Sequence, residues 1–238
     1  MYASTPLARS WTIRYFPRMC GRYTMASPEE WIRQELDLFD LPDDYRPRYN
    51  IAPTQEVLAV VRAGDSLRAG WLRWGLIPFW AKDPAIGNRM INARADTIAS
   101  KPAFRDAFRR RRCLIVADGF YEWQHVGSRK VPMWIHRESH RPFTFAGIWD
   151  RWQPPEGEPI VSCAIITTEA NDALRPIHER MPVILPPEAR ATWLDPDADP
   201  ETLLGLLRPY PGDDLRAHAV STLVNSPRND LPECIEPV

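Results

Sequence analysis

Proline is the feature that most limits what this sequence can fold into. The chain contains 25 prolines against 11 glycines. Because proline fixes φ and lacks a backbone donor, many short elements joined by stiff turns are expected instead of long helices. With 238 residues, 44% of them hydrophobic, the chain is long enough to bury one substantial core. We therefore expect one domain made of short elements.

Apolar runs rich in β-branched and aromatic residues predict most of these elements to be strands. The runs cover residues 56–63, 67–77, 113–123, 131–137, 143–152, 161–170 and 215–224. The sequence contains no βαβ alternation, no glycine-rich phosphate-binding motif and no internal repeat. This pattern predicts the α+β class: a single mixed, strand-rich domain with a few short peripheral helices.

One helix is predicted over residues 27–39. Ser27 fits the N-cap, Pro28 the first turn, and Glu30 completes a capping box. Ile32, Leu36 and Phe39 then share one face at helical spacing. Shorter helices are expected within 101–111, 187–194 and 200–207.

Charge and cysteine usage limit the possible functions. The net charge of −1 gives no global case for nucleic-acid binding, so any such surface must be a local basic groove. The run Arg109–Arg112 is either such a surface or a helix end that caps its own dipole. The four cysteines (Cys20, Cys113, Cys163 and Cys234) lack CxxC spacing, which favours free thiols in a reducing cytoplasm over disulfides or zinc. We expect no metal and no cofactor.

Residues 1–18 differ from the rest of the chain. They contain three arginines and no acidic residue, and they lack the apolar core of a secretory signal. No later stretch is long enough to span a membrane. We interpret 1–18 as an extension from a mis-assigned start, or one that is removed, and 19–238 as the domain.

Four short stretches combine reactive or amide side chains with turn signals. They are "MCGRYT" (Cys20 and Arg22), "RMINARADT" (Asn92 and Arg94), "ADGFYEWQ" (Glu122 and Trp123) and "RPIHERMPVIL" (His178 and Arg180). The candidates for catalysis among them are Cys20, Asn92, Glu122 and His178. A thiol with a histidine and a carboxylate available for proton transfer is typical of a thiol hydrolase. Each residue also has a structural alternative, and chain order does not establish that they meet.

Cys20 directly follows Met19, so initiation at Met19 and removal of that methionine would make Cys20 the first residue. An N-terminal cysteine is a 1,2-aminothiol whose α-amine has a reference pKa of about 7.7–8.0. Its amine condenses with an aldehyde to an imine, and the adjacent thiolate closes a thiazolidine ring with the advantage of an intramolecular reaction. An internal cysteine cannot react in this way, because its nitrogen is an amide.

Several blocks resemble one protein family in order and spacing. They are "MCGRYT", "RYNIAPTQ", "WGLIPFW", "INARADT", "ADGFYEW", "IHERMPVIL" and "VSTLVNSPRNDLPECIEPV". From Met19 onward the sequence is similar to the SRAP family, the SOS response-associated peptidases or abasic-site processing proteins.

The resemblance implies a protein that crosslinks to abasic sites in single-stranded DNA through an N-terminal cysteine, here Cys20. The thiazolidine shields the lesion during the DNA damage response, and autopeptidase and lyase activities are implied as well. Glu122 would relay protons during imine formation and during removal of the residues ahead of Cys20. His178 would promote opening of the deoxyribose ring and reversal of the crosslink, and Asn92 would orient the amine or a sugar oxygen.

DNA contacts are expected from arginines and aromatic rings in the same blocks. Arg22 and Arg94 are the predicted phosphate ligands. Trp74, Trp80 and Trp123 are candidates to stack on bases, with ordinary core packing as the alternative for each.

Two other functions remain open at the level of sequence. One is a thiol peptidase or amidase that uses internal Cys20 with His178. The other is a non-enzymatic module that binds single-stranded DNA. In the favoured interpretation the protein acts as a monomer, with single-stranded DNA carrying abasic sites as its partner.

Overall fold

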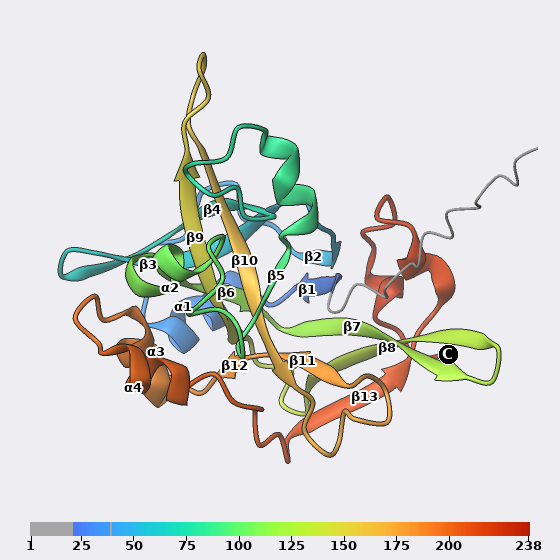
Figure 1. The fold of residues 1–238 in the computed structure, drawn as a ribbon. Coiled ribbons are helices and arrows are strands. Elements are labelled where there is room, and N and C mark those ends of the chain that lie inside the picture. Colours follow the sequence, from blue (N-terminus) through green and yellow to red (C-terminus); the bar gives the residue numbers. More distant parts are fainter. Residues whose placement is uncertain (1–20, 39) are drawn as a thin grey trace, which may run out of the picture.

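Two sheets account for most of the protein (Figure 1). The computed structural model describes residues 21–38 and 40–238. The strands are β1 (Tyr23–Met25), β2 (Arg48–Ile51), β3 (Glu56–Ala63), β4 (Ser66–Trp74), β5 (Asn92–Arg94), β6 (Arg112–Ala117), β7 (Gly119–Val126), β8 (Arg129–Arg137), β9 (Phe143–Trp152), β10 (Ile160–Glu169), β11 (Arg180–Pro182), β12 (Ile184–Leu185) and β13 (Leu215–Ala219). The helices are α1 (Glu29–Leu36), α2 (Arg105–Arg110), α3 (Pro187–Leu194) and α4 (Pro200–Gly205), with 3₁₀ segments at Pro84–Arg89, Thr222–Asn225 and Pro232–Cys234.

The large sheet follows the order β11-β10-β4-β3-β6-β9-β12, with β5 also paired to β10. Its path closes into a ring, because β9 pairs along β10 from Ile160 to Ile165. β10 runs parallel to β4 and β5 and antiparallel to β9 and β11. Every residue of β6 is buried inside this arrangement, as its continuous apolar run predicts.

The small sheet has the order β13-β8-β7-β1-β2 and is joined to the large sheet at Asp118. The predicted single strand over 113–123 is therefore wrong, because Asp118 separates β6 from β7 and the two strands lie in different sheets. The Asp118 carboxylate accepts hydrogen bonds from Thr24 Oγ1 (2.6 Å), Ser27 N (2.6 Å) and Ser27 Oγ (2.9 Å). Burial raises the pKa of Asp118, and the hydrogen bonds from Thr24 and Ser27 oppose that shift.

Asp118 also explains an error in the predicted start of the first helix. The N-cap of α1 is Pro28, without a side-chain capping hydrogen bond, so the predicted Ser27 cap and capping box are wrong. The Ser27 hydroxyl donates to buried Asp118 instead. The predicted apolar face is confirmed at Ile32 and Leu36, whereas Phe39 lies outside the described residues.

The C-terminal segment covers one side of the small sheet. The predicted strand over 215–224 ends at Ala219, and Thr222–Asn225 forms a 3₁₀ turn. Val220 and Val224 pack there against Tyr121 and Trp134. The amide of Asn50 in β2 donates to the carbonyl oxygens of Val224 (3.2 Å), Ser226 (2.9 Å) and Asn229 (2.7 Å), which fixes the segment.

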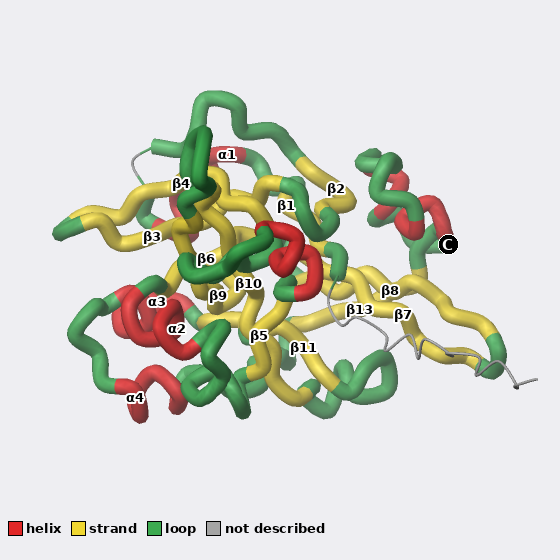
Figure 2. Tube along the Cα trace, turned by 45° about the horizontal axis from the view of Figure 1, so that its top comes forward, coloured by secondary structure: helices red, strands yellow, loops and turns green. Residues whose placement is uncertain are grey.

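One continuous core connects the two sheets. The main cluster of buried residues includes Tyr23 and Phe120 of the small sheet together with Ile115 and Ile165 of the large sheet. The short helices lie at the periphery (Figure 2), so the predicted strand-rich α+β fold is confirmed. Among the described helices, none combines the length and apolar character needed to cross a membrane.

Candidate functional site

β7 presents Glu122 on the face that it shares with Phe120 and Gln124, because side chains alternate along a strand. Phe120 belongs to the main core, and Glu122 is only 4% exposed. Further along this face, Gln124 Nε2 donates to the carbonyl oxygen of Pro176 at 3.3 Å. That bond joins the Glu122 face of β7 to the turn that carries His178.

His178 lies in the turn between β10 and β11. Its backbone N–H donates to Leu174 O at 3.0 Å, and its Nδ1 accepts from the backbone N–H of Arg180 at 3.1 Å. In the neutral ring the proton therefore resides on Nε2, which is left as the donor. Burial lowers the pKa of His178, so the neutral form is favoured near neutral pH.

Asn92 opens β5, directly beside β10. It pairs with Ile165, and Arg94 pairs two residues further along with Thr167. On the other edge of β10, Arg180 of β11 pairs with Glu169. Asn92 and the His178 turn are thus both connected to the C-terminal half of β10, which pairs with β5 through Ile165–Thr167 and with β11 through Thr167–Glu169.

A pair of arginines flanks the same strand end. Arg94 is exposed and forms an ion pair with Asp96 (Nη2 to Oδ2, 2.6 Å). Arg180 Nη2 donates to the carbonyl oxygen of Thr167 (2.6 Å) and to its hydroxyl (3.1 Å). Burial and the nearby charge of Arg94 lower the pKa of Arg180. The sequence singles out Arg180 with His178 in "RPIHERMPVIL" but gives it no role at the site.

The guanidinium of Arg22 forms hydrogen bonds with other residues of the protein. Its Nη1 donates to Asn50 Oδ1 (2.9 Å) and Val224 O (2.5 Å), and Nη2 donates to Asn225 O (3.3 Å). The Arg22 carbonyl accepts from Tyr121 N at 3.0 Å, so the first described residues lie beside β7 one position before Glu122. The guanidinium fixes the chain that leads into β1, and its predicted contact with a DNA phosphate stays a prediction.

The three tryptophans occupy different environments. Trp74 is fully buried, donates through its indole N–H to Ile91 O (2.9 Å) and packs edge-on against Tyr23, so its interpretation as a base-stacking residue is wrong. Trp123 is partly exposed and donates to Asn225 Oδ1 at 2.8 Å. Trp80 is 48% exposed and is available to a ligand.

The arginines of the basic run Arg109–Arg112 also differ in their exposure. Arg112 is buried and donates to four carbonyl oxygens at the ends of α2 and α3, those of Phe108, Arg109, Trp193 and Asp195. The alternative of a helix end capping its own dipole therefore describes Arg112. Arg109 and Arg110 remain exposed.

Cys20, the predicted nucleophile, lies outside the described residues. Cys113, Cys163 and Cys234 are buried free thiols. Burial raises the pKa of each of them, which keeps them protonated and poorly nucleophilic. Within the described part of the chain, no group of three or more His, Cys, Asp or Glu side chains is arranged to hold a metal ion.

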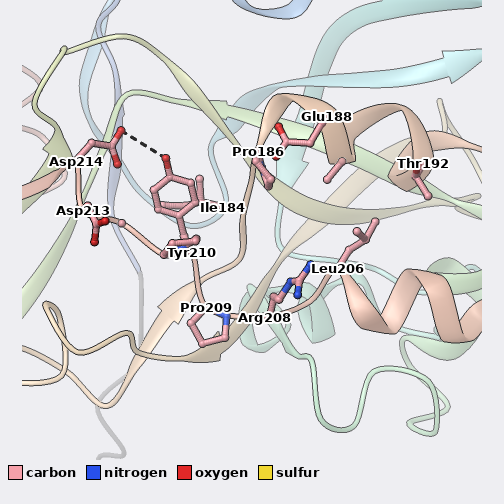
Figure 3. Close-up of a pocket in the computed structure, with 13 residues that line it drawn as sticks. Ile184, Pro186, Glu188, Thr192, Leu206, Arg208, Pro209, Tyr210, Asp213 and Asp214 are labelled. Carbon is pink, nitrogen blue, oxygen red and sulfur yellow. Dashed lines mark hydrogen bonds between the residues drawn. The ribbon is translucent and has the colours of Figure 1, made fainter.

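A separate groove of about 670 Å³ lies between α3 and residues 206–214 (Figure 3). Glu188, Leu206, Arg208 and Tyr210 are among the residues that line it, and none of the predicted site residues does. Asn92 belongs to β5 and His178 to the turn before β11, and both of these strands pair with β10. Glu122 belongs to β7, whose Gln124 contacts Pro176 in the His178 turn.

Comparison with known proteins agrees with this architecture. A crystal structure of a protein from Bacteroides thetaiotaomicron superposes with a TM-score of 0.79 at 28% identity, covering 92% of this chain and 100% of that one. Abasic site processing protein YoqW of Bacillus subtilis (strain 168) is 48% identical over 222 residues, which are 92% of this chain and 99% of that protein. Abasic site processing protein HMCES of Gallus gallus is 37% identical over 242 residues, covering 88% of this chain and 69% of that protein.

The family model of the SOS response associated peptidases (SRAP) matches residues 19–227. This match covers nearly all of the described chain and contains every block on which the resemblance rests except the last, 220–238, of which it includes residues 220–227. The chain therefore belongs to the SRAP family.

Proposed function

We propose that this protein processes abasic sites in single-stranded DNA by forming a covalent bond to them through Cys20. The observation that carries the proposal is the entry of the chain beside the site. Tyr121 N donates to Arg22 O, two residues after Cys20 and one residue before Glu122. The relatives named abasic site processing proteins support the substrate class.

The chemistry needs Cys20 as the first residue. The neutral α-amine attacks the aldehyde of the ring-opened deoxyribose, and loss of one water gives an imine. The Cys20 thiolate then adds to the imine carbon and closes the thiazolidine, while the imine nitrogen takes up a proton. No oxidant, reductant or metal enters this balance.

The described side chains supply the proton transfers. Glu122 exchanges protons with the amine and the departing hydroxyl, and the same carboxylate assists hydrolysis of the Met19–Cys20 bond when the extension is present. His178 Nε2–H donates to the sugar oxygen during ring opening, and it takes part in reversal of the crosslink. Asn92 orients the amine or the sugar oxygen, and Arg94 binds a flanking phosphate.

Intact mass spectrometry before and after mixing with a single-stranded oligonucleotide that carries one abasic site tests the proposal. We expect a free mass that begins at Cys20 and an adduct equal to protein plus DNA minus one water. Because an imine has the same mass, borohydride is added. A thiazolidine resists reduction, whereas an imine gains two hydrogens.

Cys20→Ala is the matched variant, since it keeps an α-amine and loses the thiol. It should give only a borohydride-trapped imine and no stable adduct. A wild-type mass that begins at Met1, with no adduct, would contradict the proposal and favour a thiol hydrolase. Salt-sensitive DNA binding without any adduct in either protein would favour a binding module.

A further inference from the structure

Asn171 begins the turn that connects β10 to His178. Its Oδ1 accepts from the backbone N–H of Leu174 at 2.9 Å, and its backbone carbonyl accepts from Arg175 N at 3.0 Å. Its Nδ2 donates to the carbonyl oxygen of Tyr210 at 2.9 Å, 39 residues further along the chain. A single amide side chain thus closes its own turn and attaches it to a distant segment.

His178 is held by the same turn. Leu174, whose N–H meets Asn171 Oδ1, accepts through its own carbonyl from the backbone N–H groups of Ile177 (2.8 Å) and His178 (3.0 Å). The Leu174 side chain is 4% exposed and belongs to the main core. The buried Leu174 side chain anchors the turn in the core. Asn171 binds the peptides on both sides of Leu174: its side chain accepts from Leu174 N, and its backbone carbonyl accepts from Arg175 N in the peptide whose carbonyl oxygen holds His178.

The segment on the far side of Asn171 is itself well anchored. Tyr210 OH donates to Asp214 Oδ2 at 3.4 Å (Figure 3), and Arg137 Nε donates to the same oxygen at 2.7 Å. Gly212 has φ +70°, and a Cβ added there would lie 2.6 Å from Asn171 Nδ2. Glycine at 212 therefore permits the close approach of Asn171 to this segment.

We propose that Asn171 is a positioning residue for His178, which holds the imidazole in its half-buried location by connecting the 171–178 turn to the Tyr210 carbonyl. The consequence for catalysis rests on the proposed function, since it matters there only if His178 moves protons. The charged and titratable groups around His178 are Glu179 and Arg180 of its own segment and His125 of β7. None of them is altered in the test.

The test compares Asn171→Ala, Asn171→Asp and Asp172→Ala. Asn171→Ala removes both side-chain hydrogen bonds, and Asn171→Asp keeps the acceptor for Leu174 N but loses the donor to Tyr210 O. Asp172→Ala is the matched control, because this side chain in the same turn is 96% exposed and pairs only outward with Arg175. The imidazole of His178 is titrated by NMR, and its signal is assigned among the five histidines by its loss in His178→Gln.

For Asn171→Ala we expect the His178 titration midpoint to rise toward the ordinary value of about 6.5, because a loosened turn exposes the ring to water. Crosslinking should slow about tenfold with a matching change in its pH profile, as expected for loss of hydrogen bonds of ordinary strength. Asn171→Asp should shift the midpoint less, and Asp172→Ala should not shift it. If Asn171→Ala is recovered unfolded, the Asn171→Asp titration decides.

A lower melting temperature with an unchanged His178 midpoint and pH profile would overturn the inference and leave Asn171 a purely structural residue. Failure of the proposed function is a different result. If His178→Gln crosslinks at the wild-type rate, the catalytic role of His178 is wrong, while the NMR midpoint still decides whether Asn171 positions the ring.

Discussion

Glu122, the proton relay of the proposed mechanism, has a side chain that is almost completely shielded from water. It is 4% exposed, on the β7 face that Gln124 ties to the His178 turn. In such a location a carboxylate is an effective proton relay, because it is held in place and exchanges little with solvent.

Glu122→Gln should therefore slow crosslinking about 100-fold or more, since general acid–base catalysis contributes about 10²–10⁴. Affinity for intact single-stranded DNA should stay unchanged. The rate is measured on denaturing gels, with Glu138→Gln as the control because Glu138 is exposed and pairs with Arg216. Equal rates for the two variants would remove Glu122 from the mechanism.

The two tryptophans of the "WGLIPFW" block, Trp74 and Trp80, are expected to have different roles: Trp74 in stability and Trp80 in DNA binding. Trp74→Ala should lower the free energy of unfolding by about 3–5 kcal/mol, because it empties a fully buried site and removes one of the two donors to Ile91 O. Trp80→Ala should change stability by less than about 0.5 kcal/mol and weaken single-stranded DNA binding by about 1–3 kcal/mol. Urea unfolding and fluorescence anisotropy test the pair, and unaltered DNA affinity in Trp80→Ala would assign that ring to another role.

At the scale of elements, Arg112 connects α2 to α3. It satisfies carbonyl oxygens at the C-terminal ends of both helices, which would otherwise be buried without donors.

Arg112→Ala should thus destabilise the protein by roughly 2 kcal/mol or more, because charged hydrogen bonds are lost and carbonyls are left unpaired. Arg110→Ala, in the same basic run but exposed, should stay within about 0.5 kcal/mol of wild type. Chemical denaturation measures both. Equal stabilities would mean that water replaces the Arg112 donors.

Local patterns predicted the long elements well and the short ones poorly. β3 and α3 have the predicted bounds. The run 56–63 is mostly apolar and rich in valine, and 187–194 begins with a proline, so the residues of each segment are enough to predict it. β1, β5, β11 and β12 span two or three residues each and exist only through pairing with distant strands. Asp118 gave no sequence signal for the change of sheet, since its four hydrogen bonds come from residues more than 90 positions away.

For the candidate site as well, features within one sequence block were predicted, and features that depend on distant residues were not. Asn92, Glu122 and His178 were selected from family blocks. The structure places Asn92 and the His178 turn on strands beside β10, and it connects the Glu122 strand to that turn through Gln124. For Trp74 the sequence left base stacking and core packing open, and it gave Arg180 no role, because neither burial nor cross-strand pairing can be inferred from a short sequence block. Asn171 carries no motif at all, and its contacts with Leu174 and Tyr210 depend on tertiary structure.

For the whole molecule, buried histidines couple stability to pH. His136 is buried, donates through Nδ1 to Arg137 O and stacks on Trp134 and His140. Burial lowers its pKa, and the positive charges of His140, His218 and Arg216 act in the same direction. The unfolded chain therefore takes up the proton first as the pH falls.

The free energy of unfolding should consequently decrease as the pH drops below about 6.5, by up to ~1.4 kcal/mol per pH unit for each proton involved. His178, whose pKa is lowered in the same way, adds a second proton. His136→Gln should flatten the dependence between pH ~7 and ~5, and comparison with wild type cancels the contribution of other groups. Parallel stability curves from urea titrations would contradict this assignment.

The contact between Arg22 and Val224 determines when, during synthesis, the N-terminal part of the chain can reach its final structure. The Arg22 guanidinium binds the carbonyl oxygen of Val224, which the ribosome adds 202 residues later. During synthesis, Arg22, which directly precedes β1, has no partner for this contact until the C-terminal segment emerges. In the proposed mechanism, a nascent or prematurely terminated chain thus has Cys20 before Arg22 has gained its contact with Val224, so we expect full crosslinking activity only from the completed translation product.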